Sequence, residues 1–155
     1  MRMLFFSFLM IVTMGCASTQ PQVVDTGPHV GEISANQLLS DYPAFNATYQ
    51  AYQPSAEDMA AIKLLQGKSI MVLFGTWCHD SEREVPKLLK LLDVSGTKLT
   101  ELSLHGVNYN KQEPTNLHKQ FNMLFTPTII LLDGKQEIGR IVEKPQINLA
   151  ADLAK

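Results

Sequence analysis

Runs of apolar residues, and the breaks between them, divide the chain into alternating helical and extended segments. Two continuous apolar runs, 70–74 and 128–132, are typical of buried strands, and 99–107 alternates apolar and polar residues. Asp133-Gly134 predicts a hairpin turn before a returning strand over 138–142. Helices are expected at 34–39, 55–66, 79–92, 115–121 and 145–153. This order predicts an α/β domain with a central mixed β-sheet flanked by helices.

Two of the expected helices begin with residues suited to capping. Ser34 precedes the first helix, and Ser55 with Asp58 forms a capping-box pattern at the second. Between these helices, aromatic residues recur at spacings of three and four, which favours packing against the core over a ligand site. They are Tyr42, Phe45, Tyr49 and Tyr52.

The N-terminus carries an apolar segment of another kind. Arg2 precedes an apolar run over 3–12, which is too short to cross a bilayer comfortably. The sequence Thr13-Met14-Gly15-Cys16 follows and resembles the lipobox of bacterial lipoproteins. The resemblance implies a lipoprotein signal peptide over 1–15 and a lipid on Cys16. An ordinary secretory signal peptide and an uncleaved anchor helix remain as alternatives.

The next segment, 16–33, has two prolines, two glycines and no periodic apolar pattern, so it is expected to be a flexible tether. The globular domain is then expected over 34–155. A lipid on Cys16 implies attachment to a membrane of the bacterial cell envelope, on the periplasmic side. Ala17 is not the aspartate of a retention signal, which implies the outer membrane in a Gram-negative cell.

Composition narrows the classes of function. Thirteen basic and fifteen acidic residues give a net charge of −2, so no basic surface is expected to bind nucleic acid. Two cysteines and four scattered histidines do not suggest a zinc site, and we expect neither a metal nor a cofactor. The histidines His29, His105 and His118 lie in no motif, and we expect them at the surface or in capping positions.

The segment 74–81, FGTWCHDS, resembles the active site of the thioredoxin superfamily, in which a buried strand leads to W-C-x-x-C at a helix N-terminus. Pro86 lies eight residues after Cys78, where that family's helix carries a proline. Thr126-Pro127, followed by IILLDG, resembles the family's cis-proline, strand and hairpin. The resemblance covers about 68–155, and its W-C-x-D-S-x-R-E-V-P pattern is similar to bacterial members of unassigned role. It implies a thioredoxin-like fold.

The chemistry expected at Cys78 follows from its place before a helix. Unpaired backbone N–H groups and a partial positive charge at a helix N-terminus favour the thiolate, the reactive form of cysteine. The acidic residues that follow oppose this effect. Trp77 is expected either to shield the sulfur or simply to pack. A cis bond at Pro127 would turn the backbone of Thr126 toward the sulfur, whereas the alternative is a proline that only begins a strand.

Two departures from the family limit the expected chemistry. Ser81 stands in place of the second cysteine, so a mixed disulfide on Cys78 must be resolved by an external thiol. Val72 stands where many thioredoxins carry a buried aspartate. The expected function is thiol–disulfide exchange through mixed disulfides with cysteine-containing proteins or small thiols, as an oxidoreductase or isomerase lacking a resolving cysteine. The alternative is a non-catalytic module that binds a protein or peptide at the cis-proline face.

Overall fold

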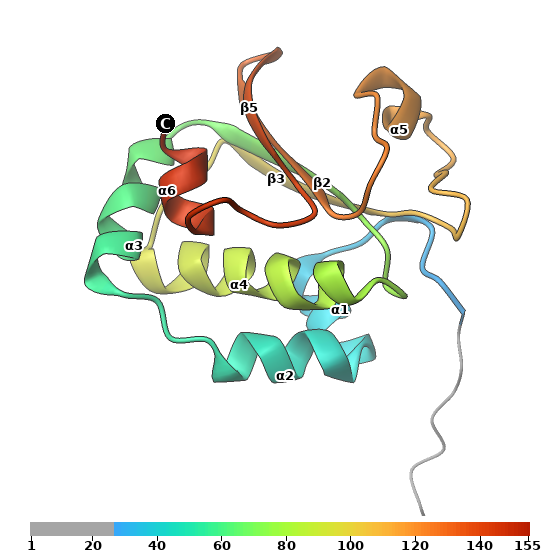
Figure 1. The fold of residues 1–155 in the computed structure, drawn as a ribbon, viewed down its shortest axis with the longest axis horizontal. Helices are drawn as coiled ribbons and strands as arrows, with labels where there is room; N and C mark the ends of the chain where they lie inside the picture. Colours follow the sequence, from blue (N-terminus) through green and yellow to red (C-terminus); the bar gives the residue numbers. More distant parts are fainter. Residues whose placement is uncertain (1–26) are drawn as a thin grey trace, which may run out of the picture.

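A computed structural model describes residues 27–155 of the chain (Figure 1). The segment expected to be a signal peptide, Cys16 and Ala17 lie outside the described residues, so the expectations attached to them stay predictions. Within residues 27–155, no helix has the length and apolar character needed to span a membrane.

In the described part of the chain, five strands form one mixed sheet in the order β1-β3-β2-β4-β5. The strands are β1 (Gly31–Glu32), β2 (Ser69–Phe74), β3 (Glu101–Gly106), β4 (Thr128–Asp133) and β5 (Gln136–Val142). β2 and β3 are parallel, whereas β1, β4 and β5 are each antiparallel to their neighbours. The C-terminal ends of β2 and β3 and the N-terminal end of β4 therefore meet at one end of the sheet. We call this end the Cys78 end.

Among residues 27–155, six helices and one 3-10 turn pack around the sheet. They are α1 (Ala35–Asp41), α2 (Pro43–Ala51), α3 (Ala56–Ile62), η1 (Lys63–Leu65), α4 (His79–Ser95), α5 (Leu117–Gln120) and α6 (Leu149–Leu153). Figure 1 shows α4 running beneath the sheet with α2 below it, and α5 on the opposite side. The coarse prediction of an α/β domain with a mixed sheet between helices is confirmed.

The main core lies between the sheet and α4. Phe74 of β2, Leu88 and Leu91 of α4, and Ile129 of β4 are fully buried there. Phe45 of α2 is also fully buried, with its ring 5.8 Å from that of Phe74. The aromatic stripe of α2 therefore serves packing, because its buried member completes this core.

The predicted caps are present at both helix starts. The Ser34 hydroxyl accepts a hydrogen bond from the Gln37 N–H at 3.2 Å. Ser55 and Asp58 make both bonds of a capping box, which satisfies two N–H groups that α3 cannot satisfy internally. These local patterns set where α1 and α3 begin.

The predicted boundary between tether and domain is wrong. Gly31 and Glu32 pair with Gly106 and His105 of β3, and the side chain of Ile33 is buried in the core. A strand at the edge of a sheet leaves backbone groups unpaired, and this short segment satisfies some of them. The domain therefore begins before residue 34, and only the part of the expected tether before residue 27 lies outside the described residues.

Two expected helices are shorter than predicted. The segment 115–121 contributes only α5, and the closing helix begins after Asn148 rather than at Pro145. Asn148 caps α6, because its side chain accepts from the Ala151 N–H at 2.8 Å. An asparagine side chain that caps the first turn defines the start of the helix more strongly than the proline three residues upstream.

The expectation of surface or capping positions fails for two histidines. His105 is buried within β3, whose last four residues are all buried. The His118 side chain is largely buried against Glu113, with Nδ1 of His118 3.1 Å from Oε1 of Glu113. These two imidazoles are therefore part of the folded interior.

Candidate functional site

Cys78 lies at the junction between β2 and α4, at the end of the sheet where β2 and β3 end and β4 begins. It occupies the N-cap position of α4, and its N–H donates to the Gly75 carbonyl at 3.1 Å. Gly75 has no side chain where the Trp77 ring passes, and a Cβ there would lie 2.7 Å from Cε2 of Trp77. The glycine thus allows the chain to turn closely from strand to helix with the indole folded over it.

The Cys78 sulfur faces the segment that precedes β4. Its thiol donates to the Thr126 carbonyl at an Sγ–O distance of 3.3 Å. The Thr126-Pro127 peptide bond is cis, and both residues are buried. Cys78 itself is half-buried and is a free thiol. Residues 48 positions apart in the chain are therefore in contact, as the sequence analysis predicts.

Trp77 lies beside the thiol and packs against the loop that follows β3. Its indole N–H donates to the Val107 carbonyl at 3.1 Å. Its ring centroid lies 5.3 Å from that of Tyr109, at an interplanar angle of 42°. The indole is only half-buried, so it both packs and contributes to the surface near the sulfur.

Ser81, which stands in place of a second cysteine, bonds to the backbone of the turn before α4. Its side chain is fully buried, and its hydroxyl accepts from the Gly75 N–H at 3.2 Å. This bond satisfies a buried backbone donor in the turn before Cys78. Ser81 therefore positions Cys78 indirectly, by holding the turn that carries it.

The charged residues after Cys78 are largely paired with one another. Asp80 lies 2.6 Å from the guanidinium of Arg83, and Glu82 lies 3.0 Å from Nδ1 of the exposed His79.

In the core, Val72 is fully buried among apolar side chains. Val72, at the position compared above with a buried aspartate, therefore adds no acidic or basic group to the site.

A surface that the sequence analysis did not single out surrounds the thiol. Tyr109 is 65% exposed, Leu124 is 69% exposed and Phe125 is 47% exposed. With Trp77, these side chains form what we call the apolar rim. Tyr109 lies against Trp77, and Phe125 immediately precedes Thr126. The only signal in the sequence was Leu124-Phe125, a bulky apolar pair directly before Thr126 in a segment without helical or strand periodicity.

The buried carboxylate of Glu113 holds the loop that carries the rim. It accepts from the Thr115 N–H at 2.7 Å and from the Thr115 hydroxyl, and it contacts the His118 ring. Burial alone raises the pKa of Glu113, but the hydrogen bonds from Thr115 and His118 outweigh it and lower the pKa to about 2. Glu113 is therefore an anion at neutral pH that fixes the loop between β3 and β4.

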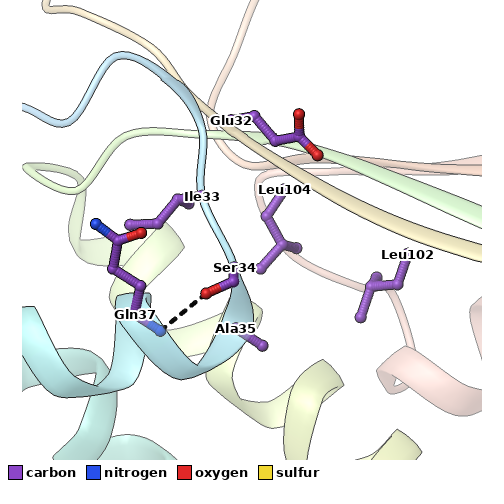
Figure 2. Close-up of a pocket in the computed structure, with 7 residues that line it drawn as sticks. All are labelled: Glu32, Ile33, Ser34, Ala35, Gln37, Leu102 and Leu104. Carbon is purple, nitrogen blue, oxygen red and sulfur yellow. Dashed lines mark hydrogen bonds between the residues drawn. The ribbon is translucent and has the colours of Figure 1, made fainter.

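Other parts of the described structure offer less chemistry. No group of three or more histidine, cysteine or acidic side chains in residues 27–155 is arranged to hold a metal ion. A pocket beside β1 and the start of α1 is lined by Glu32, Ser34, Gln37 and four apolar residues (Figure 2). Its serine hydroxyl already accepts from Gln37, as the dashed line in Figure 2 shows. Cys78 does not line this pocket.

Comparisons with known proteins bear on the fold alone. No family model and no curated protein matches this chain. A Pseudomonas aeruginosa protein of unknown function is similar in structure, with a TM-score of 0.54 and 16% identity, over 77% of this chain and 82% of that one. An HIV 4E10 epitope-scaffold is similar with a TM-score of 0.53 and 21% identity, over 81% of this chain and 77% of the scaffold. These similarities show a shared α/β architecture and assign no activity.

Proposed function

We propose that this chain is a lipid-anchored protein of the bacterial cell envelope, with a thioredoxin-like domain that performs thiol–disulfide exchange through Cys78. The observation that carries the proposal is the meeting of three features at one point. A thiol lies at the start of a 17-residue helix, is partly open to solvent, and lies 3.3 Å from the carbonyl before a cis-proline. At the N-cap position the sulfur lies beside the unpaired N–H groups and the partial positive charge of the helix start, an environment that suits attack by sulfur on a disulfide.

The exchange begins when the ionised sulfur of Cys78 attacks one sulfur of a partner's disulfide. A bond forms between Cys78 and that sulfur, and the partner's second sulfur leaves as a thiolate. An external thiolate then attacks the mixed disulfide and releases Cys78. Each step conserves the number of disulfide bonds. Because Cys78 is the only cysteine in residues 27–155, release depends on a thiol from another molecule or from the partner itself.

The surroundings of Cys78 support access by a partner. His79 is exposed, Cys78 is only half-buried, and three side chains of the apolar rim, Tyr109, Leu124 and Phe125, are exposed to solvent. The Ser81 hydroxyl accepts from the Gly75 N–H, so no hydrogen bond from Ser81 to the sulfur is in the way of a partner. The partners that fit are cysteine-containing proteins or small thiols, and no cofactor is needed.

The test measures mixed-disulfide formation by the folded protein. In the mature lipoprotein Cys16 carries the lipid, so Cys78 is the only thiol. We expect a model disulfide, such as bis-hydroxyethyl disulfide, to form an adduct at Cys78 that is visible by mass spectrometry. The adduct is expected to form faster in the native protein than in the same protein unfolded in urea, and a reducing thiol should release it.

The control is Cys78→Ser, which removes the sulfur and retains a small polar side chain. A native protein whose Cys78 reacts no faster than the unfolded chain would contradict thiol–disulfide exchange as the function. If such a protein nevertheless bound an extended peptide at Thr126-Pro127, the module that binds without catalysis would be the better assignment.

A further inference from the structure

The N-terminal segment enters the domain at the Cys78 end. β1 pairs with the last residues of β3, and the His29 N–H donates to the Thr76 hydroxyl at 3.0 Å, two residues before Cys78. Gly106 permits this approach, since a Cβ there would lie 2.4 Å from the His29 carbonyl oxygen. At the right of Figure 1, the blue start of the described chain, the start of α4 and the loop leading to α5 come together. The N-terminal segment thus leaves the domain beside the thiol.

The apolar rim lies at this same end of the domain. Leu124 and Phe125 come just before β4, and Tyr109 follows β3, so all three project from the end where the N-terminal segment leaves. Nζ of Lys111 lies 5.9 Å from the ring centroid of Phe125. Aromatic rings, leucine and a lysine with its amine at the edge are the side chains that settle at the boundary between water and lipid. A cluster of exposed apolar side chains of this kind indicates a contact surface.

The length of the preceding chain limits which end of the domain can reach a membrane. Ten residues lie between Cys16 and Gly27, so the eleven Cα–Cα steps from one to the other span at most about 40 Å when the chain is fully extended. As a coil, the same length spans about 18 Å on average. A domain of this size is about 35 Å across. The Cys78 end reaches the lipid without stretching the chain, whereas the opposite end requires nearly full extension.

We propose that the apolar rim rests on the bilayer that holds the lipid of Cys16, so that Cys78 is presented at the membrane surface. This inference rests on the lipid anchor that forms part of the proposed function. Attachment through a short chain gives the rim an effective concentration at the membrane on the order of millimolar. Few exposed side chains are then sufficient for docking. The partner cysteine that Cys78 meets belongs to a membrane protein or lipoprotein and lies close to the same bilayer surface.

The single tryptophan of the chain makes this orientation measurable, because Trp77 belongs to the rim. The lipoprotein is reconstituted into vesicles of phosphatidylethanolamine and phosphatidylglycerol, with and without bromine on the acyl chains. Bromine quenches indole emission only at short range, so we expect lower Trp77 emission in the brominated vesicles.

Two leucines provide a matched pair of variants. Leu124 in the rim and Leu64 in η1 are both 69% exposed, but Leu64 precedes β2 at the opposite end of the sheet. Leu124→Ser is expected to lower the ratio of docked to undocked protein about tenfold, the effect of removing one leucine side chain from an apolar contact. Leu64→Ser is expected to leave the quenching unchanged.

Equal Trp77 emission in the two kinds of vesicle would overturn the proposal, as would equal loss of quenching in Leu124→Ser and Leu64→Ser. If quenching is absent and Leu124→Ser slows the reaction of Cys78 with a peptide disulfide, the rim binds a polypeptide partner instead. A chain that lacks lipid on Cys16 would overturn both the docking and the anchor. The reaction of Cys78 with a model disulfide in solution does not depend on vesicles, so it reports on the exchange chemistry separately.

Discussion

Replacing Glu113 with glutamine tests whether a buried anion holds the loop that carries the apolar rim. The glutamine keeps the size of the side chain but cannot remain an anion. It also has only one acceptor oxygen, so it cannot accept from Thr115 and from the His118 ring at the same time. The Glu113 side chain is fully shielded from solvent, which means that water cannot replace these bonds.

The magnitude follows from the pKa of Glu113, which falls from an ordinary value of 4.5 to about 2 in the folded protein. Each pKa unit corresponds to about 1.4 kcal/mol, so ionised Glu113 contributes about 3 kcal/mol to the free energy of unfolding. Because the folded-state pKa is depressed, this contribution is fully present above about pH 4.5. It is lost as the pH falls toward about 2, where the folded protein also becomes protonated at this site.

The assay is urea unfolding followed by Trp77 emission, at a series of pH values from 7 to 3. We expect Glu113→Gln to lose about 3 kcal/mol near pH 7, and the difference from the unmodified protein to shrink as the pH falls below about 4.5. Glu101→Gln, at an exposed position on β3, is the control and is expected to change the free energy of unfolding by less than about 0.5 kcal/mol. A difference that stays constant from pH 7 to pH 3, or that is absent at pH 7, would refute this account of Glu113.

Three further substitutions test the packing around the site, two by urea or thermal unfolding and one by the emission spectrum of Trp77. Ser81→Ala leaves the buried Gly75 N–H without its acceptor and is expected to cost about 1–3 kcal/mol; a cost near zero would mean that the bond contributes little. Gly75→Ala places a Cβ against the Trp77 ring, so a shift in Trp77 emission is expected, and an unchanged spectrum would contradict the close approach. Leu91→Ala removes a fully buried side chain from α4 and is expected to cost about 2–5 kcal/mol, whereas a cost below 1 kcal/mol would show that the core collapses around the gap.

The amino-acid pattern alone was sufficient for features that depend on neighbours in the chain. The caps at Ser34 and Ser55, the strand that leads to Cys78, and the hairpin at Asp133-Gly134 all follow from residues within one turn or one strand. The contact between Cys78 and Thr126 was also foreseen, but through a resemblance to a known arrangement and not through local pattern.

Features that join distant segments of the chain could not be predicted from such local patterns. The strand at Gly31–Glu32 exists because the edge of β3 offers it backbone partners, and nothing in its own two residues favours a strand. The direction of Ser81, toward the Gly75 N–H, depends on how the turn before α4 folds. The Glu113 side chain is fully shielded from solvent, although a carboxylate usually prefers water. Its burial is possible because Thr115 and His118 provide hydrogen-bond partners.

The same distinction applies to the apolar rim. In the sequence Tyr109, Leu124 and Phe125 look like ordinary candidates for the core, because hydrophobicity indicates that a side chain prefers to leave water but not where it can do so. Their exposure beside Cys78 results from strand order and from a loop held by a buried anion. Periodicity along the sequence reports how a residue interacts with its near neighbours in the chain. The surface and the site depend on contacts between distant segments, which form only when the strands pair in the correct order and register.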